Sequence, residues 1–418
     1  MIRPLGAFER ALRLSDLYSP FNIVAALELE SPPPPAEIQR ALAALQTRHP
    51  FLRARVELRG KRPWFVEIEN PALPFTLIEE NTNWLDVVER ELHRRMDSAG
   101  PLFRWVYIYN ASRAVLILTF QHAIVDATSA ARLLHETLTL ATDPLASFPT
   151  LQPAPAAQAR FPPSSGLLRY AARQLADEFR YQLASRGHRR PPLRLGGQPR
   201  VLTATLDSAL TESLARRARK ENVTLNSLLQ AAILQAVNRC LYNGERTPMR
   251  TFAFPDLRSY VTPPLDAENL GAYISMLRYT FTLDGTRSVW DLARAVTATL
   301  QDSFQRGDKY SAHLMSENLM KMMLRLKSTR MGATALSYTG VNSLEKQYGE
   351  TKVRALHGFI ANIDLGPEFT AQASLFGDEL ILDMVYLDSD MDRPKAEAIA
   401  GEIREILVRA ILKDADKR

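Results

Sequence analysis

The sequence predicts an α/β (α+β) fold of two lobes, each a mixed β-sheet with flanking helices, with a cleft between the lobes. Apolar strand-like runs and amphipathic helical patterns follow one another in similar order in both halves of the chain. A proline-rich stretch separates the halves, and 418 residues make a long chain for one compact domain. We therefore expect an N-terminal lobe over residues 1–145, a linker over 146–200 and a C-terminal lobe over 201–418.

The N-terminal lobe shows both the helical and the strand periodicity of apolar residues. Between residues 36 and 48, Ile38, Leu42 and Leu45 recur on one helical face, whereas residues 51–58 place an apolar side chain at every second position. The expected strands are 23–30, 51–58, 103–109 and 113–120, and the expected helices are 36–48, 84–96 and 128–140.

The linker is recognised by its prolines, with Pro191-Pro192 and Gly196-Gly197 near its end, and it carries one amphipathic helix over residues 167–183. In the C-terminal lobe, Thr224 is expected to cap a long helix. The expected strands of this lobe are 201–206, 249–254, 276–282, 335–338, 370–376 and 379–386, and the expected helices are 210–220, 228–237, 289–304, 312–327 and 393–412.

Composition narrows the class of protein. The formal charge of +6 suits an acidic partner, such as a CoA thioester or an acidic carrier protein, and equally suits a solvated basic surface. Arginine clusters such as residues 216–220 lack interleaved aromatic residues, so nucleic acid is not an expected partner. The single cysteine excludes an internal disulfide. No leader and no apolar run of about 20 residues is visible, so we expect a cytoplasmic protein with no transmembrane segment. We also expect the protein to be a monomer.

The most informative motif is His122-Ala-Ile-Val-Asp126, which follows an apolar strand-like run and precedes a helical pattern. A histidine at the end of a buried strand is held rigidly, and its neutral form accepts a proton near physiological pH. The same spacing recurs at His93-Arg-Arg-Met-Asp97, on the outer side of an arginine-rich helix, where a surface role is expected.

Other catalytic signals are missing from the sequence. No histidine has a partner at metal-ligand spacing, so no metal is expected. The glycine-rich nucleotide motifs and the G-x-S-x-G serine elbow do not occur. His122 is therefore the one titratable residue whose surroundings favour catalysis.

Several separated segments, taken in order, resemble the condensation-domain superfamily of HxxxD acyltransferases. This superfamily includes polyketide-associated acyltransferases, alcohol acetyltransferases and chloramphenicol acetyltransferases. The similar segments are Glu9-Arg-Ala-Leu12, Ala41-Leu42, Arg48-His-Pro-Phe-Leu-Arg53, Asp97-Ser-Ala-Gly-Pro-Leu-Phe-Arg104, His122-Ala-Ile-Val-Asp126, Asp256-Leu-Arg258, Leu270-Gly-Ala-Tyr-Ile-Ser275, Ser337-Tyr-Thr-Gly340 and Asp383-Met-Val-Tyr-Leu-Asp388. Because Asp97 belongs to one of these segments, its spacing from His93 is accidental.

The resemblance implies two chloramphenicol-acetyltransferase-like lobes, with an active-site tunnel between them and His122 near its middle. It implies an acyltransferase that takes an acyl group from acyl-CoA or a phosphopantetheinyl acyl carrier protein and esterifies a small alcohol. His122 would be the general base, and neither a covalent intermediate nor a cofactor would be needed.

The resemblance also assigns roles to neighbouring residues. Asp126 would hold the turn by pairing with Arg258, away from the cavity. Ser337 would be an oxyanion donor or an ordinary strand-end hydroxyl. Gln121 and Ala127 stand on the acceptor side, where relatives commonly carry histidine and glycine, and the Ala127 methyl group would narrow the acceptor site.

Two alternatives remain open from the sequence. The motif does not distinguish a hydroxyl from an amine acceptor, so an amide-forming condensation enzyme fits equally. Ala127 also keeps open a non-catalytic relative that binds a carrier protein or ligand. The methionines between 315 and 323 fit either an adaptable acyl pocket or core packing.

Overall fold

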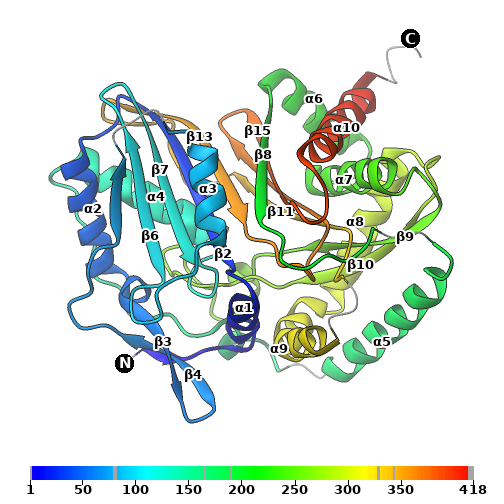
Figure 1. Ribbon diagram of the computed structural model, residues 1–418, viewed down its shortest axis with the longest axis horizontal. Helices are drawn as coiled ribbons and strands as arrows, with labels where there is room; N and C mark the ends of the chain where they lie inside the picture. Colours follow the sequence, from blue (N-terminus) through cyan, green and yellow to red (C-terminus); the bar gives the residue numbers. More distant parts are fainter. Residues whose placement is uncertain are drawn as a thin grey trace.

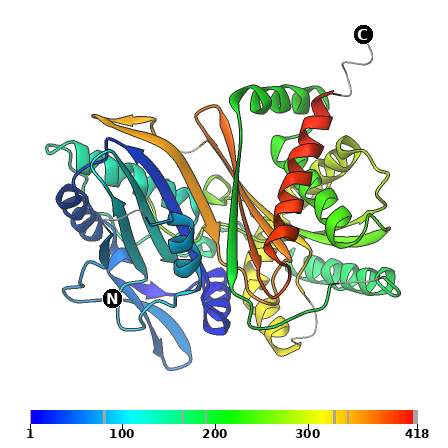
Figure 2. The same cartoon turned by 45° about the horizontal axis from the view of Figure 1, so that its top comes forward.

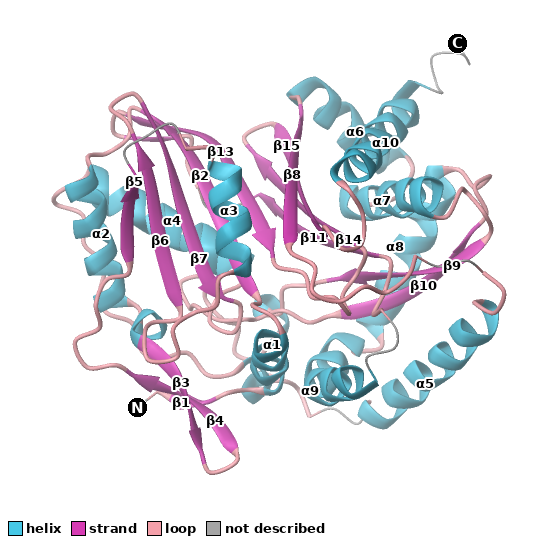
Figure 3. Ribbon diagram, in the orientation of Figure 1, coloured by secondary structure: helices cyan, strands magenta, loops and turns pink. Residues whose placement is uncertain are grey.

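The computed structural model describes residues 2–78, 82–163, 166–188, 191–326, 330–341 and 344–412. Within this part of the chain, two lobes lie side by side, each containing a six-stranded sheet with flanking helices (Figure 1). Figure 3 shows the two sheets as separate sets of strands that approach each other near the centre of the molecule. The predicted fold class is confirmed.

The first sheet carries the strand that leads to His122. It contains β12 (Gln347–Tyr348), β13 (Thr351–Ile360), β2 (Asn22–Glu30), β7 (Arg113–Gln121), β6 (Phe103–Tyr109) and β5 (Phe75–Ile78), in that order. Strands β2 and β7 are antiparallel along their whole length, and only β5 runs parallel to its neighbour in this sheet.

Helices cover both faces of the first sheet. Alternate side chains of β2 point to opposite faces, so Ala25 and Leu27 pack in a different cluster from Val24 and Ala26. One cluster contains side chains of α4 (Ala127–Thr142) and α2 (Pro35–Arg48), and the other contains side chains of α3 (Trp84–His93). Burial on both faces explains why these strands read as continuous apolar runs.

The second sheet is also mixed and forms the core of the other lobe. It contains β10 (Leu277–Leu283), β9 (Thr247–Ala253), β11 (Thr334–Val341), β14 (Phe369–Phe376), β15 (Glu379–Leu387) and β8 (Pro199–Leu206), in that order. The helices of this half of the chain are α6 (Ser208–Lys220), α7 (Leu225–Leu241), α8 (Val289–Gln305), α9 (Asp308–Leu326) and α10 (Arg393–Leu412).

The remaining elements lie around the two lobes. A small sheet combines β1 (Arg3–Pro4), β4 (Arg62–Glu67) and β3 (Ala54–Arg59), and α1 (Ala7–Tyr18) packs against α9. The linker contains α5 (Leu167–Ala184), as predicted. Short 3-10 helices occur at Pro50–Arg53, Ala157–Arg160 and Arg258–Tyr260.

The main topological difference from the expectation is β13, for which no strand was predicted. Although it belongs to the second half of the chain, β13 pairs with β2 and extends the first sheet, as Figure 2 shows for the long strand beside β2. Its charged residues and a bulge between Val353 and Ala355 interrupt the apolar alternation. The second half of the chain therefore supplies β12 and β13 to the first sheet.

Smaller differences concern local structure. Helix α1 and strands β4 and β5 were not predicted, the first turn of the expected strand 51–58 is a 3-10 helix, and α3 ends at His93 rather than at residue 96. Lys327, the expected last residue of α9, lies outside the described residues. No described helix is long and apolar enough to cross a membrane.

Candidate active site

His122 lies at the C-terminal end of β7, where the chain leaves the centre of the first sheet. Its backbone N–H donates to the Phe21 carbonyl at 3.3 Å, and the Ile124 N–H donates to the Gln121 carbonyl at 3.1 Å, which closes a tight turn. Ala123, Ile124 and Val125 are buried in the apolar core of the lobe. Buried neighbours on both sides therefore fix the position of the His122 side chain, which is 4% exposed.

The hydrogen bonding of the imidazole decides its tautomer. Nδ1 of His122 lies 3.0 Å from the Val125 carbonyl oxygen, which can only accept, so Nδ1 carries the proton in the neutral ring. Nε2 then holds a lone pair. Burial lowers the pKa of His122, outweighing the opposite effects of the backbone contacts and Asp126. The ring is therefore neutral and able to accept a proton at Nε2.

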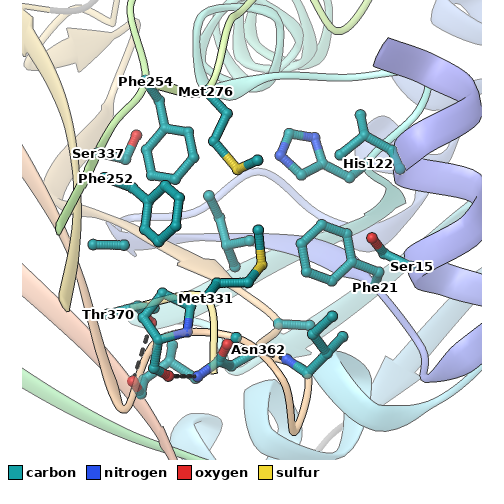
Figure 4. Close-up of a pocket in the computed structure, with 18 of the residues that line it drawn as sticks. Ser15, Phe21, His122, Phe252, Phe254, Met276, Met331, Ser337, Asn362 and Thr370 are labelled. Atoms are coloured by element: carbon teal, nitrogen blue, oxygen red, sulfur yellow. Dashed lines mark hydrogen bonds between the residues drawn. The ribbon is translucent and has the colours of Figure 1, made fainter. Parts of the chain in front are cut away.

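His122 faces a small apolar cavity between the two lobes (Figure 4). The Phe21 ring stacks on the imidazole, with centroids 5.8 Å apart. Most of the wall is apolar and comes from α1, α9, the second sheet and the segments that join its strands. Representative lining residues are Phe8, Leu12, Phe252, Phe254, Met276 and Met320. Such a wall excludes water and accommodates an apolar group next to Nε2.

Asp126 does not line this cavity. It connects the turn that follows His122 to the second lobe. Its carboxylate accepts hydrogen bonds from Arg258 at 2.8 and 2.9 Å and from the backbone N–H groups of Ser129 and Tyr273 at 2.9 Å each. Burial would raise the pKa of Asp126, but Arg258 and these donors outweigh it and lower the pKa. The carboxylate therefore stays ionised and caps the N-terminus of α4.

Arg258 is equally constrained. It is 6% exposed, also donates to Ser129 Oγ at 2.8 Å and to Asp256 at 3.0 Å, and lies over the Tyr273 ring. Burial would lower the pKa of this guanidinium, and the two carboxylates raise it instead. The structure thus brings Asp126 and Arg258 together across the two halves of the chain.

Gln121 and Ala127, which flank the motif, do not line the His122 cavity. The Gln121 side chain donates to Asp16 of α1 at 3.1 Å, and Gln121 does not line the cavity that contains His122. Ala127, the first residue of α4, lines a second cavity. Gln372 and Asp383 line both cavities, so the His122 side and the Ala127 side adjoin at a shared wall that contains these two residues.

Ser337 of β11 lines the His122 cavity, and Figure 4 shows it on the wall opposite His122. Among the four methionines of the 315–323 stretch, Met320 lines the cavity and Met315 packs against the core of the second lobe. Part of that stretch therefore contributes to the pocket and part to packing.

The shared wall also holds charged and polar groups that the sequence reasoning missed. His357 Nδ1 lies 2.8 Å from Asp383, and its Nε2 lies 3.1 Å from Glu28. Burial would lower the pKa of His357, but the two carboxylates outweigh burial and raise it to about 9. Gln372 Nε2 is buried without a partner among the described residues. No sequence spacing indicates these groups, because strands from distant segments bring them together.

Among the described residues, no group of three histidine, cysteine or acidic side chains is placed to hold a metal ion. The second HxxxD motif is also separate from this site, since His93 is exposed at the end of α3.

Residues 195–341 match a family model described as "Phthiocerol/phthiodiolone dimycocerosyl transferase C-terminus". This segment runs from the end of the linker to β11 and includes Arg258 and Ser337. No curated protein matches the chain by sequence.

Solved structures resemble the chain over nearly its whole length. Polyketide synthase associated protein 5 from Mycobacterium tuberculosis has a TM-score of 0.71 at 18% identity, covering 97% of this chain and 98% of that one. Trichothecene 15-O-acetyltransferase from Fusarium sporotrichioides has a TM-score of 0.79 at 12% identity, covering 98% and 95%. The first condensation domain of the calcium-dependent antibiotic synthetase has a TM-score of 0.73 at 14% identity, covering 98% and 97%. At these identities the similarity concerns the fold.

Proposed function

We propose that the chain is an acyltransferase of the condensation-domain superfamily, which the family-model match and the structural neighbours support, and that it transfers an acyl group from a thioester to an alcohol, giving an ester. The observation that carries the proposal is the state of His122. A neutral imidazole, with Nδ1–H anchored and Nε2 free, lies at the wall of a buried apolar cavity. This is the arrangement that general-base catalysis requires.

The proposed reaction uses one proton acceptor and no covalent enzyme intermediate. His122 Nε2 removes the proton of the acceptor hydroxyl while its oxygen attacks the thioester carbonyl carbon. The tetrahedral intermediate then collapses with cleavage of the carbon–sulfur bond, and His122 returns the proton to the departing thiolate. A positioned base of this kind contributes about 10²–10⁴-fold to the rate.

The two cavities suggest how the substrates are arranged. The apolar walls around His122 fit the acyl group, since they offer few polar groups to an acceptor. The cavity at Ala127 and Thr128 includes polar side chains in its wall, among them Arg132 and Gln372, and fits the second substrate. The net charge of +6 favours an anionic donor, either acyl-CoA or an acidic acyl carrier protein.

Formation of an amide is the second candidate, because the structurally similar proteins include condensation domains as well as an O-acetyltransferase. Nothing in the His122 geometry discriminates between a hydroxyl and an amine. In this second candidate the same base would remove a proton from the attacking amine.

Thiol release from a panel of acyl-CoA and acyl-carrier thioesters, with and without pooled alcohols or amines, tests the proposal. We expect alcohol-dependent release that falls at least about 10²-fold in His122→Ala. His93→Ala is the matched control, because it alters the second HxxxD histidine at an exposed position. Release only with amines would select the amide reaction. No turnover of any donor, or equal release by wild type and folded His122→Ala, would refute His122-based transfer.

A further inference from the structure

Helix α5, the α-helix described within the linker, has its polar face against the protein. Glu178 forms ion pairs with Arg250 at 2.8 Å and with Arg278 at 3.4 Å, and Asp177 accepts a hydrogen bond from Thr280 at 3.2 Å. The Tyr181 ring lies 3.5 Å from the Arg250 guanidinium carbon. These partners belong to β9 and β10, so α5 is attached to the second sheet by polar contacts.

The opposite face of α5 is apolar and exposed. Leu168, Leu175, Phe179 and Leu183 are 83%, 71%, 71% and 53% exposed, and with Ala172 they recur at intervals of three and four residues. They therefore form one stripe along the helix. Figures 1 and 2 show α5 at the edge of the molecule, outside the other elements of the second lobe. A surface helix normally has the reverse orientation, with its apolar stripe facing the core.

Positive charge accompanies the stripe. Arg169 and Arg180 are exposed, they follow Leu168 and Phe179 directly, and neither forms an ion pair with a described residue. Both acidic residues of α5, Asp177 and Glu178, are turned inward to their protein partners. The outward side of the helix therefore combines leucine and phenylalanine with unpaired arginine.

We propose that α5 binds the surface of an anionic lipid membrane, with its apolar stripe inserted among the acyl chains and its arginines at the phosphates. A surface helix with leucine and phenylalanine on one side and arginine beside them has the composition of helices that lie in the membrane interface. The charge of the arginines is complementary to anionic headgroups, which favours this occupant over an apolar protein groove. The inference does not depend on the proposed acyl transfer.

Flotation of the full-length protein with vesicles tests this inference. Vesicles of phosphatidylcholine alone are compared with vesicles of phosphatidylcholine and phosphatidylglycerol, at low and high salt. We expect binding to the anionic vesicles that weakens with salt and falls at least about tenfold in Leu175→Glu/Phe179→Glu and in Arg169→Glu/Arg180→Glu. Leu145→Glu is the matched control, since Leu145 is a 93% exposed leucine in the N-terminal half and should bind like wild type.

Three results would overturn the inference. The first is a wild-type protein that does not float with anionic vesicles. The second is a Leu175→Glu/Phe179→Glu variant that floats as well as wild type. The third is a wild-type dimer in lipid-free solution that the same variant converts to a monomer, because a second copy would then cover the stripe. Thermal unfolding and lipid-free thiol release should match wild type in every variant, which separates membrane binding from folding and from acyl transfer.

Discussion

Arg258 holds the Asp126 carboxylate through two hydrogen bonds of 2.8 and 2.9 Å, 132 positions apart in the sequence. The pair connects the turn that carries His122 to the second lobe. It also leaves the aspartate without access to the His122 cavity, so the HxxxD motif combines one residue that faces the cavity with one that holds the backbone.

Asp126→Ala is therefore expected to destabilise the protein. Removing one partner of a buried ion pair leaves an uncompensated charge, which costs about 3–5 kcal/mol. Urea unfolding measures the loss. Asp256→Ala is the control, because Asp256 contacts the same arginine but its side chain is 41% exposed, and a loss of about 1 kcal/mol is expected. An Asp126→Ala protein as stable as wild type but inactive would instead give Asp126 a chemical role.

The pH dependence of kcat/KM should report the state of His122. Because burial lowers its pKa from the ordinary value of 6.5, the imidazole remains neutral at pH values where an exposed histidine is already protonated. Activity is then expected to persist as the pH falls through 6.5 and to be lost only below it. A rate profile on a soluble thioester measures this limb, and His93→Ala should leave it unchanged. An acid limb above pH 6.5 would contradict a buried neutral base.

Stability at alkaline pH should depend on His357. Its pKa of about 9 in the folded protein exceeds the ordinary value of 6.5, so the charged ring stabilises the fold fully below pH 6.5. This contribution, about 3 kcal/mol at most, is lost as the pH rises through 9. Urea unfolding of wild type and His357→Gln across this range measures it. A stability difference that does not shrink towards pH 9 would show that His357 is not held in its charged form.

Ser337→Ala is expected to lower kcat less than about tenfold. The loss of a true oxyanion donor typically costs about 10²–10³-fold, and Ser337 lies on the wall opposite His122. Steady-state kinetics with one fixed donor and acceptor are sufficient. A hundredfold loss of kcat at unchanged KM would establish Ser337 as the oxyanion donor and would require the substrate to span the cavity.

The strands that are buried on both faces could be predicted from the sequence. The runs at 23–30 and 113–120 were identified because helices cover both faces of the first sheet, which makes these strands apolar throughout. Strand β13 was missed because charged positions and a bulge interrupt its apolar alternation. The turn at His122 was predicted from its local sequence context. The pairing of Asp126 in that turn with Arg258 was predicted only from the resemblance.

The surroundings of His122 were not predictable in the same way. Phe21 stacks on the ring because β2 is paired with β7, and Gln372 and Asp383 reach the cavity from two neighbouring strands of the other sheet. Such contacts depend on sheet register and lobe packing. Neither leaves a periodic signal in the sequence.

The position of β13 limits how the protein can be divided. A fragment that ends before residue 351 would leave one side of β2 unpaired, although Ile23–Glu30 of β2 pairs with β13 in the intact chain. An uncovered apolar strand edge is a template for aggregation. We therefore expect each half to aggregate when it is produced alone. Co-production of two pieces cut within the linker would instead allow β13 to complete the sheet in trans.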